Sequence, residues 1–285
     1  MIKFGIGAWG VRNYPYPQSS YVLDWAQSRG VDVEIIDAWA DFYSFGEKEL
    51  VTMRDDYARR NLAVPAVCPT HVTLSEPDLV KQNTPRVEKA IDVAAFMGCN
   101  MINLSLVQTV PPRSSLDPQA NERHYEVIAA AVQTLADRAA QSGVSLALEL
   151  HQGTLVDTST ALLKLLRMVD RPNVGVNPDL GNALWAFPEP REKPADILQN
   201  LKPYAKFWHV KNFHRVSFGV EGQADYIEAP LPYGDIDHRL AVRQMLAEPA
   251  YEGHICVEAV YSGDPFTLID AGIAYMKELV REALA

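Results

Sequence analysis

The sequence is poor in cysteine and in long apolar runs, and each shortage excludes a class of protein. Its three cysteines, Cys68, Cys99 and Cys256, are an odd number and form no CxxC pair, so we expect free thiols in a reducing compartment. No stretch approaches the roughly 20 apolar residues of a membrane helix. The start, MIKFGIGAWG, is too broken by glycine for a secretory signal. These features predict a soluble, cytoplasmic protein that does not bind a membrane.

Positive charge is also scarce. The chain has 26 Lys and Arg residues against 36 Asp and Glu residues, which gives a net charge of −10 at neutral pH. Broad contact with nucleic acid requires Lys and Arg to displace counterions from phosphates, so no nucleic-acid partner is expected. Small anionic ligands are not excluded, because a pocket can be locally positive on an acidic protein.

What the sequence does contain is a regular alternation of short β-branched runs and helical patterns. Eight runs are apolar on both faces, as in strands covered by helices. Their starts lie roughly 30 to 50 residues apart, which leaves room for one strand, one helix and two loops. We therefore predict an α/β protein formed by a single (β/α)8 TIM barrel with eight parallel strands, as one domain over residues 1–285. The runs begin at Ile2, Asp32, Val64, Met101, Val144, Asn173, Ala205 and His254.

An open doubly wound sheet is the alternative arrangement of such units. It would normally show a glycine-rich phosphate loop after the first strand, whereas the sequence there reads AWGVRNYPYP. Two long connections, over residues 106–119 and 213–235, are typical of lids or binding segments.

Several of the predicted helices have recognisable ends. One is expected over Asn121–Ser142. The next is expected to begin after a capping residue, which is either Asp157 or Thr158. The last opens with Asp264 as the cap and Pro265 at the first helical position.

Four consecutive strands end in side chains that bind metals. Glu149 ends the fifth run (LALELHQ), Asp179 follows the sixth (VGVNPDLGN), His209 lies in the seventh (FWHVKNF) and Glu258 ends the eighth (ICVEAVY). In a TIM barrel such ends meet at one mouth, where buried carboxylates need a compensating charge. The set predicts a divalent metal site, and its oxygen and nitrogen donors suit Mn²⁺, Mg²⁺, Co²⁺ or Zn²⁺. For any one acid alone, a salt bridge across the mouth or a helix cap is the structural alternative.

These residues and the short sequence segments around them resemble the xylose-isomerase-like barrels of the sugar-phosphate isomerase/epimerase superfamily. LELH is similar to the family's strand-five ending, PDLGN to its strand-six turn and WHVKN to its HVKD, while APLPYGDID resembles its segment before the helix that precedes strand eight. The resemblance implies one divalent ion, Mn²⁺ first, held by Glu149, Asp179, His209 and Glu258. It implies an isomerase or epimerase of a monosaccharide or sugar derivative, in carbohydrate metabolism. Glu149 and Glu258 would exchange protons with a metal-stabilised enediolate.

Further side chains just after the predicted strands are candidates for substrate binding. Histidine, asparagine and lysine could bond sugar hydroxyls, and tryptophans could form an apolar wall against the sugar ring. Asn182 stands where resembling ketose epimerases have a histidine. The structural alternatives are a loop histidine, a solvated lysine and a tryptophan packed at the barrel rim. The candidates are Trp9, Trp39, His71, His151, Asn182, Trp185 and Lys211.

Three other functions remain open. A lyase or dehydratase, acting beta to a keto group of a sugar, inositol or glycoside, needs the same enediolate. An endonuclease of the abasic-site type is disfavoured by the charge of −10 and the few strand-end histidines. A non-catalytic sugar-binding subunit is disfavoured because it has no need of two opposed acids, Glu149 and Glu258. No phosphate cradle is visible, which favours a sugar without phosphate, and an apolar strip near the long connections is compatible with a homo-oligomer.

Overall fold

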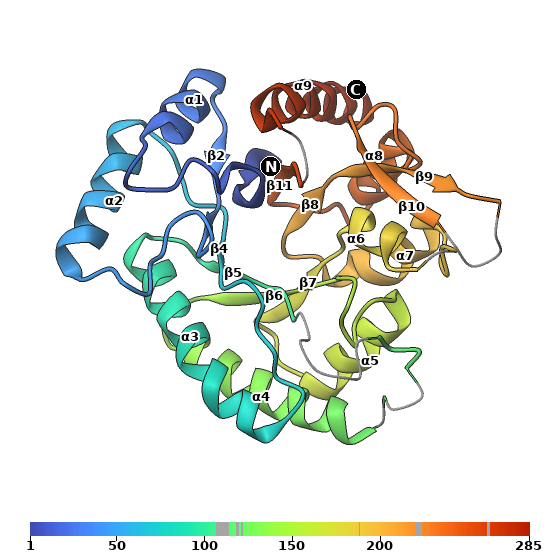
Figure 1. Ribbon diagram of the computed structural model, residues 1–285, viewed down its shortest axis with the longest axis horizontal. Helices are drawn as coiled ribbons and strands as arrows, with labels where there is room; N and C mark the ends of the chain where they lie inside the picture. The colour runs from blue at the N-terminus through green and yellow to red at the C-terminus, as the bar shows by residue number, and fades with distance from the viewer. Residues whose placement is uncertain (107–113, 118–119, 121, 188, 220–223, 261–262) are drawn as a thin grey trace.

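The computed structural model describes residues 1–106, 114–117, 120, 122–187, 189–219, 224–260 and 263–285. Parallel strands lie in the centre of the molecule and helices surround them (Figure 1). Each predicted run forms a strand, and the run from Asp32 forms two short ones. The parallel strands are β1 (Lys3–Gly7), β2 (Asp32–Val33), β3 (Ile35–Ile36), β4 (Val67–Cys68), β5 (Met101–Leu104), β6 (Ser145–Glu149), β7 (Val174–Asn177), β8 (Trp208–Val210) and β11 (His254–Glu258).

The parallel strands are neighbours in the order expected for a barrel. One sheet has the order β2-β1-β11-β8 and the other β3-β4-β5-β6-β7. β2 and β3 are separated only by Glu34, whose N–H donates to Ile6 O (3.1 Å), so the two sheets are continuous there. On the opposite side, the Lys206 N–H donates to Val176 O (3.0 Å) just before β8 begins. The strands therefore follow one another around a ring.

The helices of the barrel lie between successive strands. Of the two capping residues considered for the fifth helix, Thr158 caps it by accepting the Ala161 N–H, and Asp264 caps the last helix as predicted. Residue 121 lies outside the described residues. The helices are α1 (Tyr21–Arg29), α2 (Glu47–Arg59), α3 (Pro77–Phe96), α4 (Glu122–Ala140), α5 (Ser159–Val169), α6 (Leu180–Trp185), α7 (Pro194–Leu201), α8 (His238–Leu246) and α9 (Pro265–Ala283), with 3₁₀ turns η1 (Ala8–Val11) and η2 (Lys202–Tyr204).

The interior of the barrel has an apolar layer below a polar one. Ala147, Phe207 and Cys256 pack together in a small buried cluster. Alternate residues of a strand point to the same side, so Glu149 lies one layer above Ala147, and His209 lies one layer above Phe207. The strand periodicity thus places the predicted ligands at the carboxyl ends of the strands, above an apolar plug.

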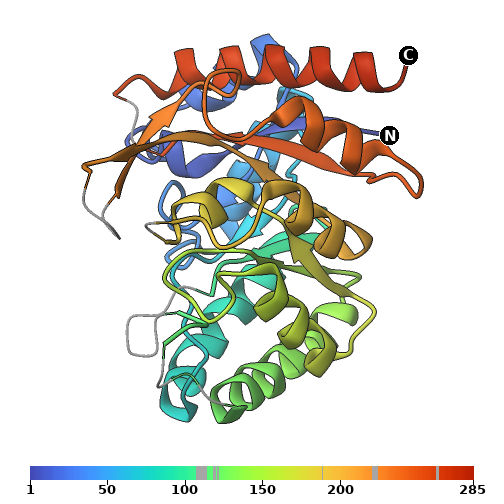
Figure 2. The same cartoon turned by 90° about the vertical axis from the view of Figure 1, so that its right-hand side faces the viewer.

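The second long connection differs from the loop expected over 213–235. It contains an antiparallel hairpin of β9 (Asn212–Ser217) and β10 (Ala224–Ala229), in which Tyr226 pairs with Arg215. Partly buried and exposed residues alternate along most of β10, so one face of this two-stranded ribbon lies against the protein. Figure 2 shows the hairpin extending past the helices at one end of the molecule. Most of the first long connection, residues 107–113 and 118–119, lies outside the described residues.

No helix in the described part of the chain has the length and apolar character needed to cross a membrane.

Candidate metal and substrate site

Three of the predicted ligands converge at the mouth of the barrel. Glu149 ends β6, Asp179 caps the start of α6 just after β7, and His209 lies in β8. One ligand atom from each lies within 4.8 Å of the others, and all three side chains are buried. The expectation that these strand ends meet is confirmed for this triad.

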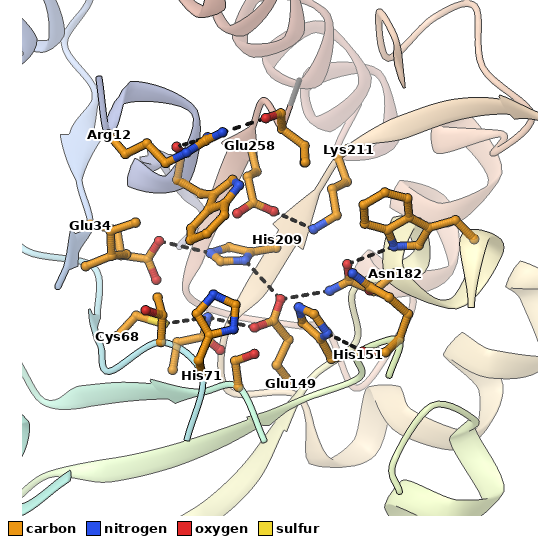
Figure 3. A pocket seen from close by; sticks show the side chains of 18 residues that line it. Arg12, Glu34, Cys68, His71, Glu149, His151, Asn182, His209, Lys211 and Glu258 are labelled. Atoms are coloured by element: carbon orange, nitrogen blue, oxygen red, sulfur yellow. Dashed lines mark hydrogen bonds and ion pairs between the residues drawn. The ribbon is translucent and has the colours of Figure 1, made fainter. Parts of the chain in front are cut away.

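Glu258, the fourth predicted ligand, is joined to the triad through a lysine. The Lys211 ammonium contacts Glu258 Oε2 and lies 2.7 Å from Asp179 Oδ2. Lys211 is only 4% exposed, so it is not a solvated lysine. Burial alone would lower the pKa of Lys211, but the carboxylates of Asp179 and Glu258 outweigh burial and raise that pKa. The ammonium therefore compensates two carboxylates of the site, and Figure 3 shows its contact with one of them, Glu258.

His209 lies between two buried carboxylates. Its Nε2 is 3.3 Å from Glu34 Oε2, and its Nδ1 is 3.5 Å from Glu149 Oε1. Burial would lower the pKa of His209, but the charges of Glu34 and Glu149 raise it well above its usual value. Burial raises the pKa of Glu34, and His209 only partly offsets this. Glu34 thus faces the side of the imidazole ring that points away from Glu149.

Amide groups hold the Glu149 carboxylate from both sides. Asn182 Nδ2 donates to Oε1 (3.0 Å) and Asn103 Nδ2 donates to Oε2 (3.3 Å). Asn177 Nδ2 in turn donates to Asn103 Oδ1 (3.2 Å). Burial would raise the pKa of Glu149, but His209 and His151 outweigh it and lower the pKa to about 2. Glu149 is therefore ionised at neutral pH, with both oxygens fixed.

The donor set fits a divalent cation. Both ring nitrogens of His209 are buried and face carboxylates, and Asp179 Oδ2 has the Lys211 ammonium as its partner. Carboxylates together with one imidazole are the ligands that first-row divalent ions share. Glu149, Asp179 and His209 could hold such an ion. Glu258 could become a fourth ligand once the Lys211 ammonium moves away from its carboxylate.

The triad opens into a cavity of about 200 Å³, which is small enough to suit a compact ligand. Trp9 meets His71 edge-on, with ring centroids 5.7 Å apart, and Trp185 stacks on Phe213 at 4.8 Å. Burial and the nearby His151 lower the pKa of His71. Of the predicted site residues, only Asp179, which is fully buried, and Trp39 are not among those that line this cavity; the lining residues among them are Trp9, His71, Glu149, His151, Asn182, Trp185, His209, Lys211 and Glu258.

Trp39 is the exception among the predicted tryptophans. It is 1% exposed, packs against Tyr16, and donates its indole N–H to Tyr14 O (2.9 Å). The expectation that Trp39 forms part of the sugar wall is wrong, because this hydrogen bond and the surrounding core hold it away from the mouth.

A model of the xylose isomerase-like TIM barrel family matches residues 23–279. The chain belongs to this family. A magnesium-bound xylose isomerase-like TIM-barrel protein from Mycobacterium smegmatis has the same fold, with a TM-score of 0.84 and 23% identity over 99% of this chain and 98% of that one.

Curated relatives are similar over shorter stretches. A 3-dehydroshikimate dehydratase of Bacillus anthracis is 32% identical over 30% of each chain. An inosose dehydratase of Clostridium botulinum is 27% identical over 55% of each chain. A ketose 3-epimerase of Arthrobacter globiformis is 28% identical over 39% of this chain and 38% of its own. The chain thus matches only about a third to a half of these relatives' lengths.

Sequence reasoning missed three residues of this xylose isomerase-like site. Glu34 interrupts the apolar run VDVEIID, and a charged residue inside a buried strand was the signal for it. Asn103 gives a weaker signal of the same kind, as a neutral polar residue inside the apolar run MINLSL. Arg12 lines the cavity from the connection after β1, and nothing in the local sequence distinguishes it from a surface arginine.

Proposed function

We propose that this protein is a divalent-metal-dependent isomerase or epimerase of a monosaccharide or sugar derivative, with Mn²⁺ as the first choice of ion. The observation that carries the proposal is the buried triad of Glu149, Asp179 and His209, within 4.8 Å of one another at the floor of a cavity. Asp179 and Glu258 are compensated by a single lysine, so the site keeps an excess of negative charge that a divalent ion would neutralise.

The two glutamates are placed for proton transfer. A bound divalent ion would supply positive charge that stabilises an oxyanion on the substrate. Both oxygens of Glu149 are oriented by amides and the residue lines the cavity, so its position suits the role of a base beside the carbonyl. Glu258 comes from a strand three places further round the ring, and it would return the proton to the neighbouring carbon or the other face. Trp9 and Trp185 line the cavity and would offer apolar faces to a sugar ring.

Metal content is the first test. Elemental mass spectrometry of the wild type, after incubation with Mn²⁺, should find about one ion per chain, and Glu258→Gln should retain less. Glu252→Gln is the matched control, because Glu252 is exposed and pairs with the chain's amino terminus. A wild type that holds no ion after excess Mn²⁺, Co²⁺ or Zn²⁺ would contradict the proposal.

The reaction itself is tested by hydrogen exchange. The metal-loaded protein should incorporate deuterium from D₂O into a ketose, next to the carbonyl, as followed by NMR. Glu149→Gln should abolish that exchange, because it removes the base. Exchange at the wild-type rate in Glu149→Gln would place the base elsewhere.

A lyase or dehydratase is the second candidate. Two of the three curated relatives above are dehydratases, and removal of water beta to a keto group begins with the same proton abstraction. Product analysis separates the two: a dehydratase forms a conjugated enone with ultraviolet absorption, whereas an isomerase or epimerase conserves mass.

A further inference from the structure

Arg12 lies across the cavity from Glu149. It follows η1 at the end of β1, whereas Glu149 ends β6. When β2 and β3 are counted as one strand, three strands lie between β1 and β6 on either side of the ring, so β1 and β6 face each other. Both residues line the same cavity (Figure 3). A ligand held at the triad would therefore extend toward Arg12.

The guanidinium of Arg12 is held in place by its surroundings. Its Nη1 donates to Trp9 O (2.7 Å) and more weakly to Val260 O (3.4 Å). The guanidinium also lies over the Trp9 ring, 4.6 Å from its centroid. Within the described residues, Nε and Nη2 of Arg12 make no hydrogen bond and no ion pair, so one edge of the planar group is available to a ligand.

Charge balance distinguishes Arg12 from the other cation of the cavity. Lys211 is the second Lys or Arg residue in the lining, and it is paired with Asp179 and Glu258. Arg12 has no carboxylate partner in the described part of the chain. A fixed, half-buried guanidinium with one open edge is suited to two parallel hydrogen bonds with a planar carboxylate.

We propose that Arg12 binds a carboxylate of the substrate, and that the substrate is a sugar acid: a polyhydroxylated ketone with a terminal carboxylate. This rests on the proposed function, because that function places the reacting carbons beside Glu149 and leaves the far end of the substrate facing Arg12. A cavity of about 200 Å³ suits a single monosaccharide unit of this kind. Among the described lining residues, Arg12 and Lys211 are the Lys and Arg side chains, and Lys211 is paired with carboxylates, so a phosphate with its greater charge would meet a single guanidinium edge here.

The test compares ligands that differ only at the terminal carbon. Calorimetry on the Mn²⁺-loaded protein would use D-fructuronate and D-tagaturonate against D-fructose and D-tagatose, with D-fructose 6-phosphate as the phosphate arm. At least one acid should bind about 10-fold or more tightly than its neutral partner, because a charged hydrogen-bonded pair is added. The proposal is overturned if neither acid binds more tightly than its neutral partner, or if no probe binds at all. A preference for the phosphate alone would show that the group bound by Arg12 is not a carboxylate.

Variants of Arg12 complete the test. Arg12→Gln should weaken binding of the acid about 10-fold more than binding of the neutral ketose, so that the preference for the acid is lost, and Arg12→Lys should retain part of the preference. Arg281→Gln, on an exposed part of α9, is the control. If Arg12→Gln weakens acid and neutral sugar equally, Arg12 only supports the loop and the proposal fails. Metal content and deuterium exchange into neutral ketoses report on the proposed function separately, so the two can fail independently.

Discussion

At the scale of single residues, buried carboxylates outnumber the cations that compensate them. Glu34, Glu149 and Asp179 are each at most 5% exposed, and His209 and Lys211 carry the positive charge among them. Removing one partner of such a set leaves the other charge buried and unpaired. The side chains around His209 should therefore determine how well the site holds an ion.

Glu34→Gln tests this at a residue that is not a predicted ligand. The carboxylate of Glu34 faces His209 Nε2 and also accepts the Ala8 N–H (3.4 Å), so it orients the ring with Nδ1 toward Glu149. Loss of such a partner typically weakens metal binding about 10- to 100-fold, and a chelator competition titration with Mn²⁺ would measure the change. Unchanged affinity, with Glu252→Gln alongside, would mean that Glu34 does not orient the ligand.

At the scale of elements, the start of α6 is packed closely against the end of β8. Asp179 caps α6 by accepting the Asn182 N–H (3.1 Å), and Asn182 reaches back to Glu149. Gly181 lies in this first turn, and a Cβ there would overlap Cγ of Lys211. The glycine of the PDLGN motif thus leaves room for the lysine that joins Asp179 to Glu258.

Gly181→Ala should therefore disturb both packing and the site. We expect a loss of about 1–3 kcal/mol in the free energy of unfolding, because the added methyl group must displace Lys211 or α6. Urea denaturation of the metal-free protein would measure it. Gly263→Ala is the control, since a Cβ there meets no described atom within 4 Å and the glycine has no positive φ. Equal stability of the two variants would show that α6 and Lys211 do not approach so closely.

At the scale of the whole molecule, stability should depend on pH through a histidine outside the cavity lining. His238 begins α8, is 1% exposed, and has its Nε2 3.3 Å from Lys211 O. Burial lowers the pKa of His238 to about 4. Its contribution is complete above the unfolded pKa near 6.5 and is lost progressively as the pH falls toward and through 4, since only the unfolded chain then takes up the proton.

His238→Gln should flatten this dependence. At pH 5 the wild type should have lost roughly 2 kcal/mol more of its free energy of unfolding than the variant, relative to pH 7.5. Urea unfolding at both pH values, in the presence of a chelator, measures the difference between the two proteins. His214→Gln, which changes an exposed histidine, should behave as the wild type. Parallel curves for His238→Gln and the wild type would show that His238 takes up a proton in the folded state.

The positions of the strands and the residue types at their ends could be predicted from local sequence patterns. Runs apolar on both faces predict strands buried between helices, and their spacing predicts a barrel whose carboxyl ends meet. Glu149, Asp179 and His209 could be found in this way because each stands at or beside a strand end, and the structure brings them together.

Which atoms of these side chains meet depends on how the barrel folds. Lys211 and Glu258 are 47 residues apart, and Glu34 contacts a histidine that lies much further along the chain. Trp39 was misjudged, and the hairpin of β9 and β10 was expected as a loop, because a local pattern does not state which surface a side chain or a ribbon will pack against. Periodicity along a strand shows which side of that strand is buried, whereas pairing across the mouth depends on closure of the whole ring. The partners of Arg12, Glu34 and Lys211 are therefore properties of the folded barrel.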